Sequence, residues 1–332
     1  MQNMFTPRSP VFVNLDITSS CNQHCIFCAV SPNRNYAFKK KEEICGLIDK
    51  LYDAGVFEIT LFGGEPLLHP EIEEIAKYTN DNGFEINLVT NGTFPNKIKR
   101  IAKYLTNASV SIHGFNATHE KITQLQGSYK LAIKSLEEFI KEGVDTAVCY
   151  TLIKDNFDEL EPFISSIFSN FEVKGVVLDR FIPRGFGKYK KEDLDVGIKN
   201  VNVALRKLDK LSRKYKKGIT TGDGLPLCFI AEDLRYIVQP CQAGILFCSV
   251  TEDGGVKLCP STETIIGNIK NISLKEIWNG KWYLEYRSFE WLPEQCKKCS
   301  LITNCYGGCK ASTGIEPYSF DVYLKSEKSG KI

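Results

Sequence analysis

The segment TSSCNQHCIFCA, residues 18–29, follows directly on the short β-rich run VFVNLDI and holds three cysteines on one tight loop. Cys21, Cys25 and Cys28 have the spacing C-x3-C-x2-C. Three thiolates suit a cubane iron–sulfur cluster, which requires four ligands, so one iron stays open to bind and activate a small molecule. Zinc sites usually pair C-x2-C with a second such pair, a form that this loop lacks. His24 is an alternative ligand, but we expect it to be a solvent-facing loop residue.

Six apolar runs alternate with helical patterns through the first two thirds of the chain. The runs are residues 11–17, 57–62, 85–90, 108–112, 146–153 and 173–181. The helical patterns are residues 39–54, a stretch opening near 70, and residues 95–104, 129–142, 159–168 and 196–215. Near-continuous Val, Ile and Leu strands between helices predict an α/β fold with a parallel sheet, as a full barrel or an open partial one. In such sheets the functional site lies at the carboxyl ends of the strands.

At its cysteine loop the sequence resembles the radical S-adenosylmethionine (radical SAM) superfamily, whose signature has this spacing and an aromatic residue, here Phe27, before the last cysteine. Gly63, Gly64 and Glu65 follow the second run, where that family has a glycine-rich turn that approaches the amino group of SAM. Glycines allow close backbone approach and unusual φ angles. The resemblance implies a partial (β/α)6 TIM-like barrel that binds SAM at these residues.

Two further positions match that family less specifically. Asn91 ends the third run in VTNG, and Ser111 lies in the fourth run, where the family contacts the ribose or carboxylate of SAM. An ordinary Asn-Gly turn and a packed strand serine are the structural alternatives.

The resemblance also implies a mechanism. SAM would chelate the open iron through its amino and carboxylate groups, and one electron from the reduced cluster would cleave it to methionine and a 5′-deoxyadenosyl radical. That radical would abstract hydrogen from an unactivated carbon. The protein would orient the substrate and exclude water, while the cofactor carries the difficult chemistry.

The composition changes after Lys217, and the rest of the chain is rich in Gly, Pro and Cys. Short strand signals, GILFCSVT and GVKLC, stand there with one helical pattern around residues 274–286. We therefore expect a barrel domain at residues 1–217 and a small iron–sulfur domain at residues 218–332.

The cysteines of this second region resemble the SPASM extension of radical SAM enzymes, which binds two auxiliary iron–sulfur clusters. Gly254 precedes Cys259 with the spacing G-x4-C, and CKKCSLITNCYGGCKA has the spacing C-x2-C-x5-C-x3-C. By that resemblance the first auxiliary cluster takes four cysteines and the second takes three. The first set is Cys241, Cys248, Cys259 and Cys309, and the second set is Cys296, Cys299 and Cys305.

The second set departs from the family pattern, which usually supplies one more cysteine. No cysteine follows Cys309, Asp321 stands at the acidic position, and Leu324 stands where a cysteine would be. Three alternatives remain: Asp321 or another oxygen group binds the fourth iron, that iron is open to substrate, or the second cluster is absent. For the whole segment the alternative is a zinc ribbon.

Three of the thirteen cysteines remain. Cys45, in the first helical pattern, and Cys149, in the fifth run, are expected to be small buried residues. Cys228, in the loop GDGLPLCF, has packing as its simplest role. The alternatives for Cys228 are a place at the active-site mouth, where its thiol donates a hydrogen atom, or replacement of the missing cluster ligand.

Three other side chains follow predicted strands. His113 and His119 come after the fourth run, where substrate contact, acid–base work and turn or capping roles are all open. Arg180 ends the sixth run, and we place it near the substrate or the SAM carboxylate. The lysine-rich stretch 206–217 is expected to be a solvated helix face.

Length and charge bound the remaining possibilities. The chain has 332 residues, of which 43% are hydrophobic, and a formal net charge of +2. The length suggests two domains, and the balanced charge gives no overall field that attracts nucleic acid or a membrane. The start MQNMFTPRSP lacks the apolar region of a secretory signal, and no apolar run is long enough to span a bilayer. We therefore expect a cytoplasmic protein, and in that reducing compartment disulfides are rare.

The resemblance implies an enzyme that modifies a ribosomally synthesised peptide by crosslinking, thioether formation, epimerisation or oxidation. The alternatives are action on a small molecule, such as a tetrapyrrole side chain or a sugar, and a non-catalytic electron carrier or cluster scaffold. Expected partners are the substrate and an electron donor such as flavodoxin or ferredoxin. Because Cys21 lies near the start, we expect no fused leader-binding domain, so a peptide would be recognised by a separate leader-peptide-binding protein or by the core site itself.

Overall fold

The protein is described by a computed structural model at residues 6–30, 36–312 and 321–325. Within these residues, ten strands form one sheet in the order β10-β9-β8-β1-β2-β3-β4-β5-β6-β7. The strands are β1 (Phe12–Thr18), β2 (Glu58–Gly63), β3 (Glu85–Thr90), β4 (Asn107–Ser111), β5 (Asp145–Leu152), β6 (Gly175–Arg180), β7 (Gly218–Thr221), β8 (Phe247–Val250), β9 (Gly255–Lys257) and β10 (Gly267–Asn268). β1 to β7 pair in parallel and in chain order. The predicted α/β fold with a parallel sheet is confirmed, in its open, partial-barrel form.

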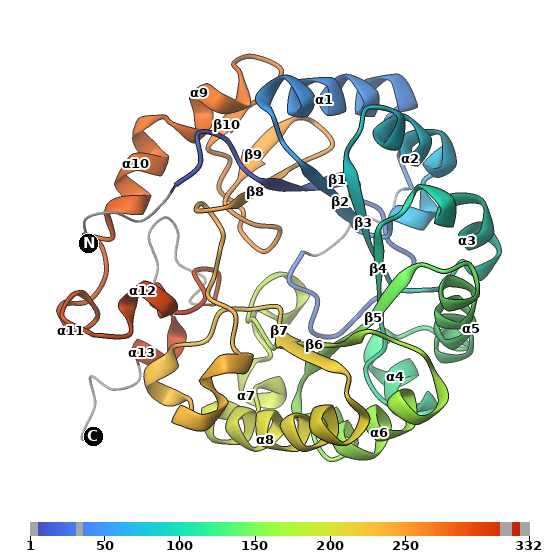
Figure 1. Ribbon diagram of the computed structural model, residues 1–332, viewed down its shortest axis with the longest axis vertical. Coiled ribbons are helices and arrows are strands. Elements are labelled where there is room, and N and C mark those ends of the chain that lie inside the picture. The colour runs from blue at the N-terminus through green and yellow to red at the C-terminus, as the bar shows by residue number, and fades with distance from the viewer. Residues whose placement is uncertain (1–5, 31–35, 313–320, 326–332) are drawn as a thin grey trace.

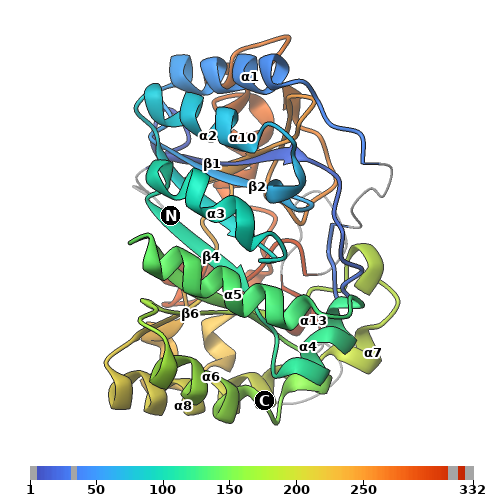
Figure 2. The same cartoon turned by 90° about the vertical axis from the view of Figure 1, so that its right-hand side faces the viewer.

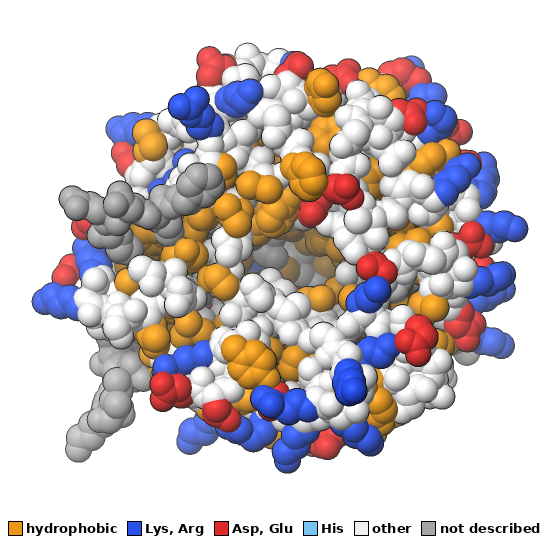
Figure 3. Space-filling model, viewed as in Figure 1, with side chains coloured by type: hydrophobic (Ala, Val, Ile, Leu, Met, Phe, Trp, Pro, Cys, Tyr) orange, Lys and Arg blue, Asp and Glu red, His pale blue; other side chains and the backbone are white. Residues whose placement is uncertain are grey.

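The two faces of the sheet have different environments. Ile86, Leu88, Val148 and Tyr150 are fully buried, whereas the residues between them on the same strands are half-buried. Because successive strand residues point to opposite faces, one face of the sheet packs under the helices and the other faces the centre of the ring. Figure 3 shows a hollow at that centre. The inner face is therefore the one that can meet a ligand.

Helices cover the outside of the curved sheet (Figures 1 and 2). The helices of the barrel are α1 (Lys41–Ala54), α2 (Ile72–Asp81), α3 (Pro95–Ile101), α4 (Asn116–Thr123), α5 (Ser128–Lys141), α6 (Leu160–Asn170), α7 (Lys191–Leu194) and α8 (Gly197–Tyr215). Six of them match the predicted helical patterns, while the short α4 and α7 were not anticipated. The helix α1 shows the common design, since Leu47, Ile48 and Leu51 form an apolar stripe against the sheet.

The sheet continues beyond residue 217. β7 pairs with β6, and β8 pairs in parallel with the other side of β1. The remaining helices, α9 (Leu274–Trp278), α10 (Lys281–Ser288), α11 (Glu294–Lys297), α12 (Ile302–Cys305) and α13 (Val322–Lys325), lie between the two ends of the sheet (Figure 1). The helical pattern at 274–286 is thus two helices, interrupted at Asn279 and Gly280. The domain division at residue 217 stays a prediction.

In the described part of the chain, no helix is both long enough and apolar enough to cross a membrane.

Candidate functional site

The cysteine loop leaves β1 at the carboxyl end of the sheet, and the end of β2 holds it there. The amide of Gly64 donates to the carbonyl of Thr18 and that of Glu65 to the carbonyl of Ser20, both at 2.8 Å. A Cβ at Gly64 would lie 2.1 Å from the carbonyl oxygen of Ser20. At Gly63, where φ is 128°, a Cβ would lie 2.2 Å from the carbonyl oxygen of Thr18. Glycine is required at both positions because the backbone of the cysteine loop occupies the space of a side chain.

Donor groups surround the first thiol of the loop. Cys21 is 7% exposed, and its Sγ accepts from the amide of Gln23 at 3.5 Å and from Asn91 Nδ2 at 3.8 Å. Cys25 and Cys28 are half-buried, and a turn joins them through a 3.0 Å bond from the Cys28 amide to the Cys25 carbonyl. N–H groups aimed at sulfur favour its thiolate form, which is the form that binds iron. These residues therefore fit an iron–sulfur cluster.

The cysteine loop also docks on α4. The amide of His24 donates to Thr123 and that of Ile26 to Ile122, each at 3.0 Å. The His24 side chain is exposed, as expected. The loop is thus held by β2 on one side and by α4 on the other.

Asn91 and Glu65 form a buried network beside Cys21. Glu65 Oε1 accepts from the Leu67 amide at 2.9 Å and from the Thr90 hydroxyl at 2.7 Å, and its Oε2 accepts from the Asn91 amide at 2.7 Å. Burial raises the pKa of Glu65 to about 7, although these donors lower it in part. Both carboxyl oxygens are used by the chain itself, so the described contacts of Glu65 join β2 to β3. Its predicted contact with SAM stays a prediction, as do those of Asn91 and of the half-buried Ser111.

His113 and His119 form a second network, next to Phe27. The edge of one ring meets the face of the other between Phe27 and His113, with centroids 4.8 Å apart. The amide of Thr151 donates to His113 Nδ1 at 3.2 Å, and the amide of His113 donates to His119 Nδ1 at 3.1 Å. Burial lowers the pKa of His119 to about 4 and that of His113 well below its usual range. Both imidazoles are therefore neutral at pH 7 and accept hydrogen bonds through Nδ1.

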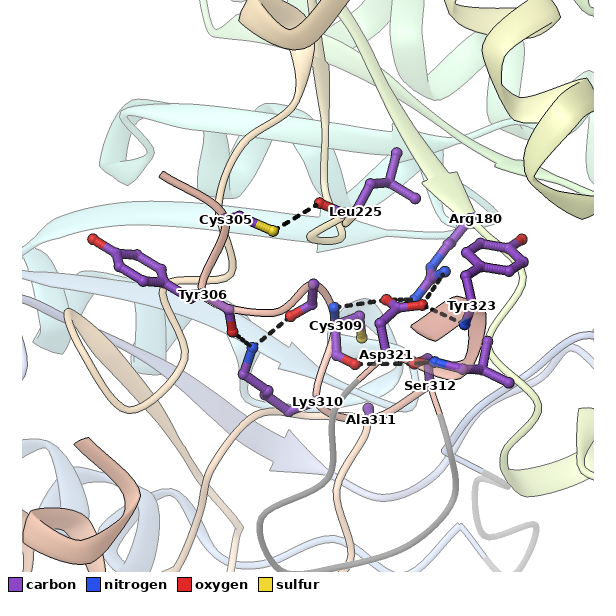
Figure 4. A network of polar contacts seen from close by, with 12 residues as sticks. Arg180, Leu225, Cys305, Tyr306, Cys309, Lys310, Ala311, Ser312, Asp321 and Tyr323 are labelled. Carbon is purple, nitrogen blue, oxygen red and sulfur yellow. Dashed lines mark hydrogen bonds and ion pairs between the residues drawn. The ribbon is translucent and has the colours of Figure 1, made fainter. Parts of the chain in front are cut away.

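Arg180 and Asp321 form a buried ion pair across 141 residues of sequence. Arg180 Nη1 donates to Asp321 Oδ1 at 3.1 Å, Nη2 donates to Oδ2, and the guanidinium lies 4.9 Å from the centre of the Tyr323 ring (Figure 4). The amides of Cys309 and Tyr323 also donate to this carboxylate, at 2.9 and 3.0 Å. The described contacts of Asp321 are therefore with Arg180 and Cys309, a cysteine of the first set. Its role as a ligand of the second cluster stays a prediction that these contacts do not support.

Three cysteines of the first auxiliary set gather around one tyrosine. Burial raises the pKa of the Tyr286 hydroxyl well above its usual range, and the nearby thiols of Cys241, Cys259 and Cys309 add to the rise. Burial also raises the pKa of Cys259 to about 12, with a contribution from the nearby Cys241. Cys248, on β8, interacts instead with Tyr283 and Arg287, and burial raises its pKa to about 12. Three members of the set thus share Tyr286 as a neighbour, whereas Cys248 interacts with other residues.

The second set lies on two short helices, α11 and α12. Cys296 and Cys305 are 8% and 7% exposed, and a 3.1 Å bond from the Cys299 amide to the Cys296 carbonyl joins the first two cysteines. The Sγ of Cys299 accepts from the Leu301 amide at 3.4 Å. No three His, Cys, Asp or Glu side chains of the described residues are grouped closely enough to hold a single metal ion.

The last three cysteines differ in exposure. Cys45 is buried on α1, Cys149 is half-buried on β5, and Cys228 is exposed in the short turn η5 (Leu227–Phe229).

Three aspartates at or near the inner strands were not predicted from the sequence as site residues. Asp179 and Asp223 line a small cavity with Arg180, at the carboxyl ends of β6 and β7. Burial raises the pKa of both carboxyl groups, and the nearby Asp223 adds to the rise at Asp179. On β1, Asp16 pairs with Lys257 at 3.5 Å, and burial raises its pKa to about 6. Two of these aspartates, Asp16 and Asp179, stand within otherwise apolar runs, and that position is the sequence signal that would have identified them.

Comparison with known proteins extends the likeness to most of the chain. A family model of the radical SAM superfamily matches residues 15–167, and one of SPASM, an iron–sulfur cluster-binding domain, matches residues 241–300. The AdoMet-dependent heme synthase of Methanosarcina barkeri is 25% identical over 97% of this chain and 99% of its own length. A PqqA peptide cyclase of Xanthomonas oryzae is 23% identical over 92% of this chain and 84% of its own length.

A solved structure shares the fold. Streptococcus suis SuiB bound to its precursor peptide SuiA has a TM-score of 0.77 and 14% identity, covering 95% of this chain and 75% of SuiB.

Proposed function

Because this chain belongs to the radical SAM superfamily and carries a SPASM iron–sulfur domain, we propose that it modifies a ribosomally synthesised peptide through hydrogen-atom abstraction. The observation that carries the proposal is the cysteine loop, which the end of β2 clamps at the carboxyl edge of the sheet. Cys21, Cys25 and Cys28 would hold a cluster there, and its chemistry when bound would be one-electron cleavage of SAM to methionine and a 5′-deoxyadenosyl radical.

In this proposal Cys21, Cys25 and Cys28 hold the cluster. Cys21 is buried and receives two donors, while Cys25 and Cys28 are half-buried. The loop contacts with β2 and α4 keep the three thiols in place while the substrate binds. A preorganised site of this kind loses little energy to rearrangement during the reaction.

The side chains of His113 and His119, next to the cysteine loop, and of Phe27, within it, carry no charge at neutral pH. His113 and His119 stay uncharged at pH 7, and Phe27 packs against His113. Such groups bring no titrating proton and little bound water to the loop, which would protect a reactive radical from side reactions.

A peptide substrate is supported by the named activities of two relatives. One is named a PqqA peptide cyclase, and SuiB was solved with the peptide SuiA. We propose that the product is a crosslink, thioether, epimer or oxidised side chain. The proposal includes a cytoplasmic location, flavodoxin or ferredoxin as electron donor, and a separate leader-binding protein.

A tetrapyrrole substrate is the second candidate. The heme synthase of Methanosarcina barkeri aligns over 99% of its own length, whereas the peptide cyclase aligns over 84%. The named activity of this relative, which aligns over 97% of this chain, supports the small-molecule alternative.

The first test concerns SAM cleavage. The full chain, purified anaerobically, loaded with iron and sulfide and then reduced, should release 5′-deoxyadenosine from SAM. Cys21→Ala should lose that activity and about four irons per chain while the auxiliary clusters remain. Loss of all iron from Cys21→Ala, or continued cleavage, would contradict the assignment of the loop.

The second test concerns the substrate. The short peptide encoded nearest to this gene and a tetrapyrrole are each incubated with enzyme and SAM. A mass change in the peptide alone supports the first proposal, and a mass change in the tetrapyrrole alone replaces it with the second.

A further inference from the structure

The second auxiliary set supplies three thiols, whereas a cubane cluster has four irons to bind. Residues 310–332 contain no cysteine. Asp321, the oxygen donor considered above, already accepts hydrogen bonds from Arg180, Cys309 and Tyr323. Among the described residues, the contacts of Asp321 therefore do not point to it as the fourth donor for Cys296, Cys299 and Cys305.

The loop after β7 lies against this set. The amide of Leu227 donates to Cys305 Sγ at 3.4 Å, and a longer contact of 4.0 Å joins the same sulfur to the carbonyl oxygen of Leu225 (Figure 4). Cys228 is the next residue of that loop and lies in the turn η5. The backbone contacts therefore bring Cys228 to Cys305, although 77 positions separate them in the sequence.

Electrostatics indicate the same neighbours. The Cys228 thiol interacts electrostatically with the thiols of Cys305, Cys296 and Cys299. These are the three members of the second set. Cys296 in turn interacts electrostatically with Cys305 and Cys299.

We propose that Cys228 is the fourth ligand of the second auxiliary cluster, completing a set of four thiolates with Cys296, Cys299 and Cys305. Each thiol would release one proton to solvent when its sulfur binds iron. A complete set leaves no iron open, so this cluster would transfer electrons and would not bind substrate. The inference rests on the SPASM domain and is independent of the peptide proposed above.

The same loop reaches both auxiliary sets. A Cβ at Gly224 would lie 2.9 Å from the Cβ of Cys241, a member of the first set. The segment from Gly224 to Cys228 thus touches one set with each of its ends. A ligand on this segment would fix the two clusters relative to each other.

Thiol footprinting tests the proposal in the unaltered protein. The loaded chain, with about twelve irons for three cubanes, is treated with iodoacetamide under anaerobic conditions and digested for mass spectrometry. Cys228 is exposed, so protection in the loaded chain requires a ligand. We expect alkylation of Cys228 only after a chelator has removed the iron. Equal alkylation of Cys228 before and after chelation would overturn the proposal. A fully loaded chain that holds only about eight irons, enough for two cubanes, and in which Cys228 is alkylated would also overturn it, because the second auxiliary cluster would then be absent.

Matched variants give a second readout. Cys228→Ala should lose about four irons per chain, or keep them with a changed electron paramagnetic resonance signal, because one iron lacks its thiolate. Cys228→Ser offers an oxygen ligand and should retain more iron than Cys228→Ala. The control is Cys45→Ala, on the barrel helix α1, and circular dichroism verifies that each variant is folded. Iron content and spectra of Cys228→Ala that equal those of Cys45→Ala would overturn the proposal.

Discussion

Glu65 shows how much a single buried carboxylate organises beside the cysteine loop. Its two oxygens accept three hydrogen bonds, from Leu67, Thr90 and Asn91, and the last of these residues also contacts Cys21. A buried acceptor that satisfies several donors is costly to replace. The Glu65 side chain therefore has a structural role, since its hydrogen bonds join the ends of β2 and β3.

We predict that Glu65→Gln destabilises the protein. An amide that keeps its oxygen toward Leu67 and Thr90 turns its NH2 group toward the Asn91 amide, so two donors face each other. The free energy of unfolding should fall by roughly 1–3 kcal/mol in urea titrations. Glu74→Gln, at an exposed position of α2, is the control and should change it by less than about 0.5 kcal/mol. Equal effects of the two substitutions would contradict the prediction.

A pH dependence follows from the second network. The folded-state pKa of His119 is about 4, below the usual 6.5, so the folded chain binds fewer protons than the unfolded chain between these values. Its contribution to stability is therefore present above about pH 6.5 and is lost as the pH falls toward 4. Between about pH 7.5 and 5.5 the loss is about 1 kcal/mol.

His119→Asn tests this dependence, because an asparagine oxygen can accept from the His113 amide without titrating. Urea titrations at both pH values should show a smaller loss of stability in the variant, by about 1 kcal/mol. The same loss in parent and variant would show that His119 is not the titrating group.

At the scale of elements, close approach of two strand ends shapes the site. The glycines after β2 leave room for the backbone after β1, and the hydrogen bonds of Gly64 and Glu65 extend that parallel pairing into the cysteine loop. Gly63 and Gly64 were predicted to approach SAM, and the close approach of the backbone after β1 is a second, purely structural reason for glycine at both positions.

Gly64→Ala should therefore displace the cysteine loop. The new Cβ would lie 2.1 Å from the Ser20 carbonyl oxygen. Because that oxygen is a backbone atom, the clash can be relieved only if the segment before Cys21 moves. We expect a loss of more than about 2 kcal/mol in stability and of about four irons per chain.

Gly46→Ala is the matched control, since nothing lies within 4 Å of its added Cβ. On the helix α1 the change should stabilise the protein by about 0.5–1 kcal/mol and leave the iron content unchanged. Retention of full iron content in Gly64→Ala would contradict the expected displacement.

At the scale of the whole molecule, one buried ion pair joins the barrel to the segment after the auxiliary cysteines. Arg180 ends β6, and Asp321 immediately precedes α13. Removing one partner of a buried pair leaves the other charge uncompensated, which costs about 3–5 kcal/mol. We predict a loss of this size for Asp321→Asn, measured by chemical unfolding.

The double variant Arg180→Met/Asp321→Leu removes both charges and should recover part of that loss. If Asp321 were instead a cluster ligand, Asp321→Asn would change the signal of the second auxiliary cluster in electron paramagnetic resonance. That change without a loss of stability would contradict the ion-pair assignment.

The predictable part of this fold and site was local. Six alternating runs were predicted as strands, and β1 to β6 lie there because a strand packed under helices selects apolar, β-branched sequence. The short strands β7 to β10 carry too few residues for a distinct period. For that reason the extension of the sheet on both sides could not be predicted.

The sequence by itself determined the cysteine loop, its thiol spacing and the alternation of strands and helices, because each depends on residues within one or two turns of each other. The tertiary structure decided which distant groups meet. Arg180 pairs with Asp321 across 141 positions of the chain, and the Leu227 amide contacts Cys305 across 78 positions. Such contacts depend on the path of the whole backbone around the barrel, and no local pattern of residues encodes that path.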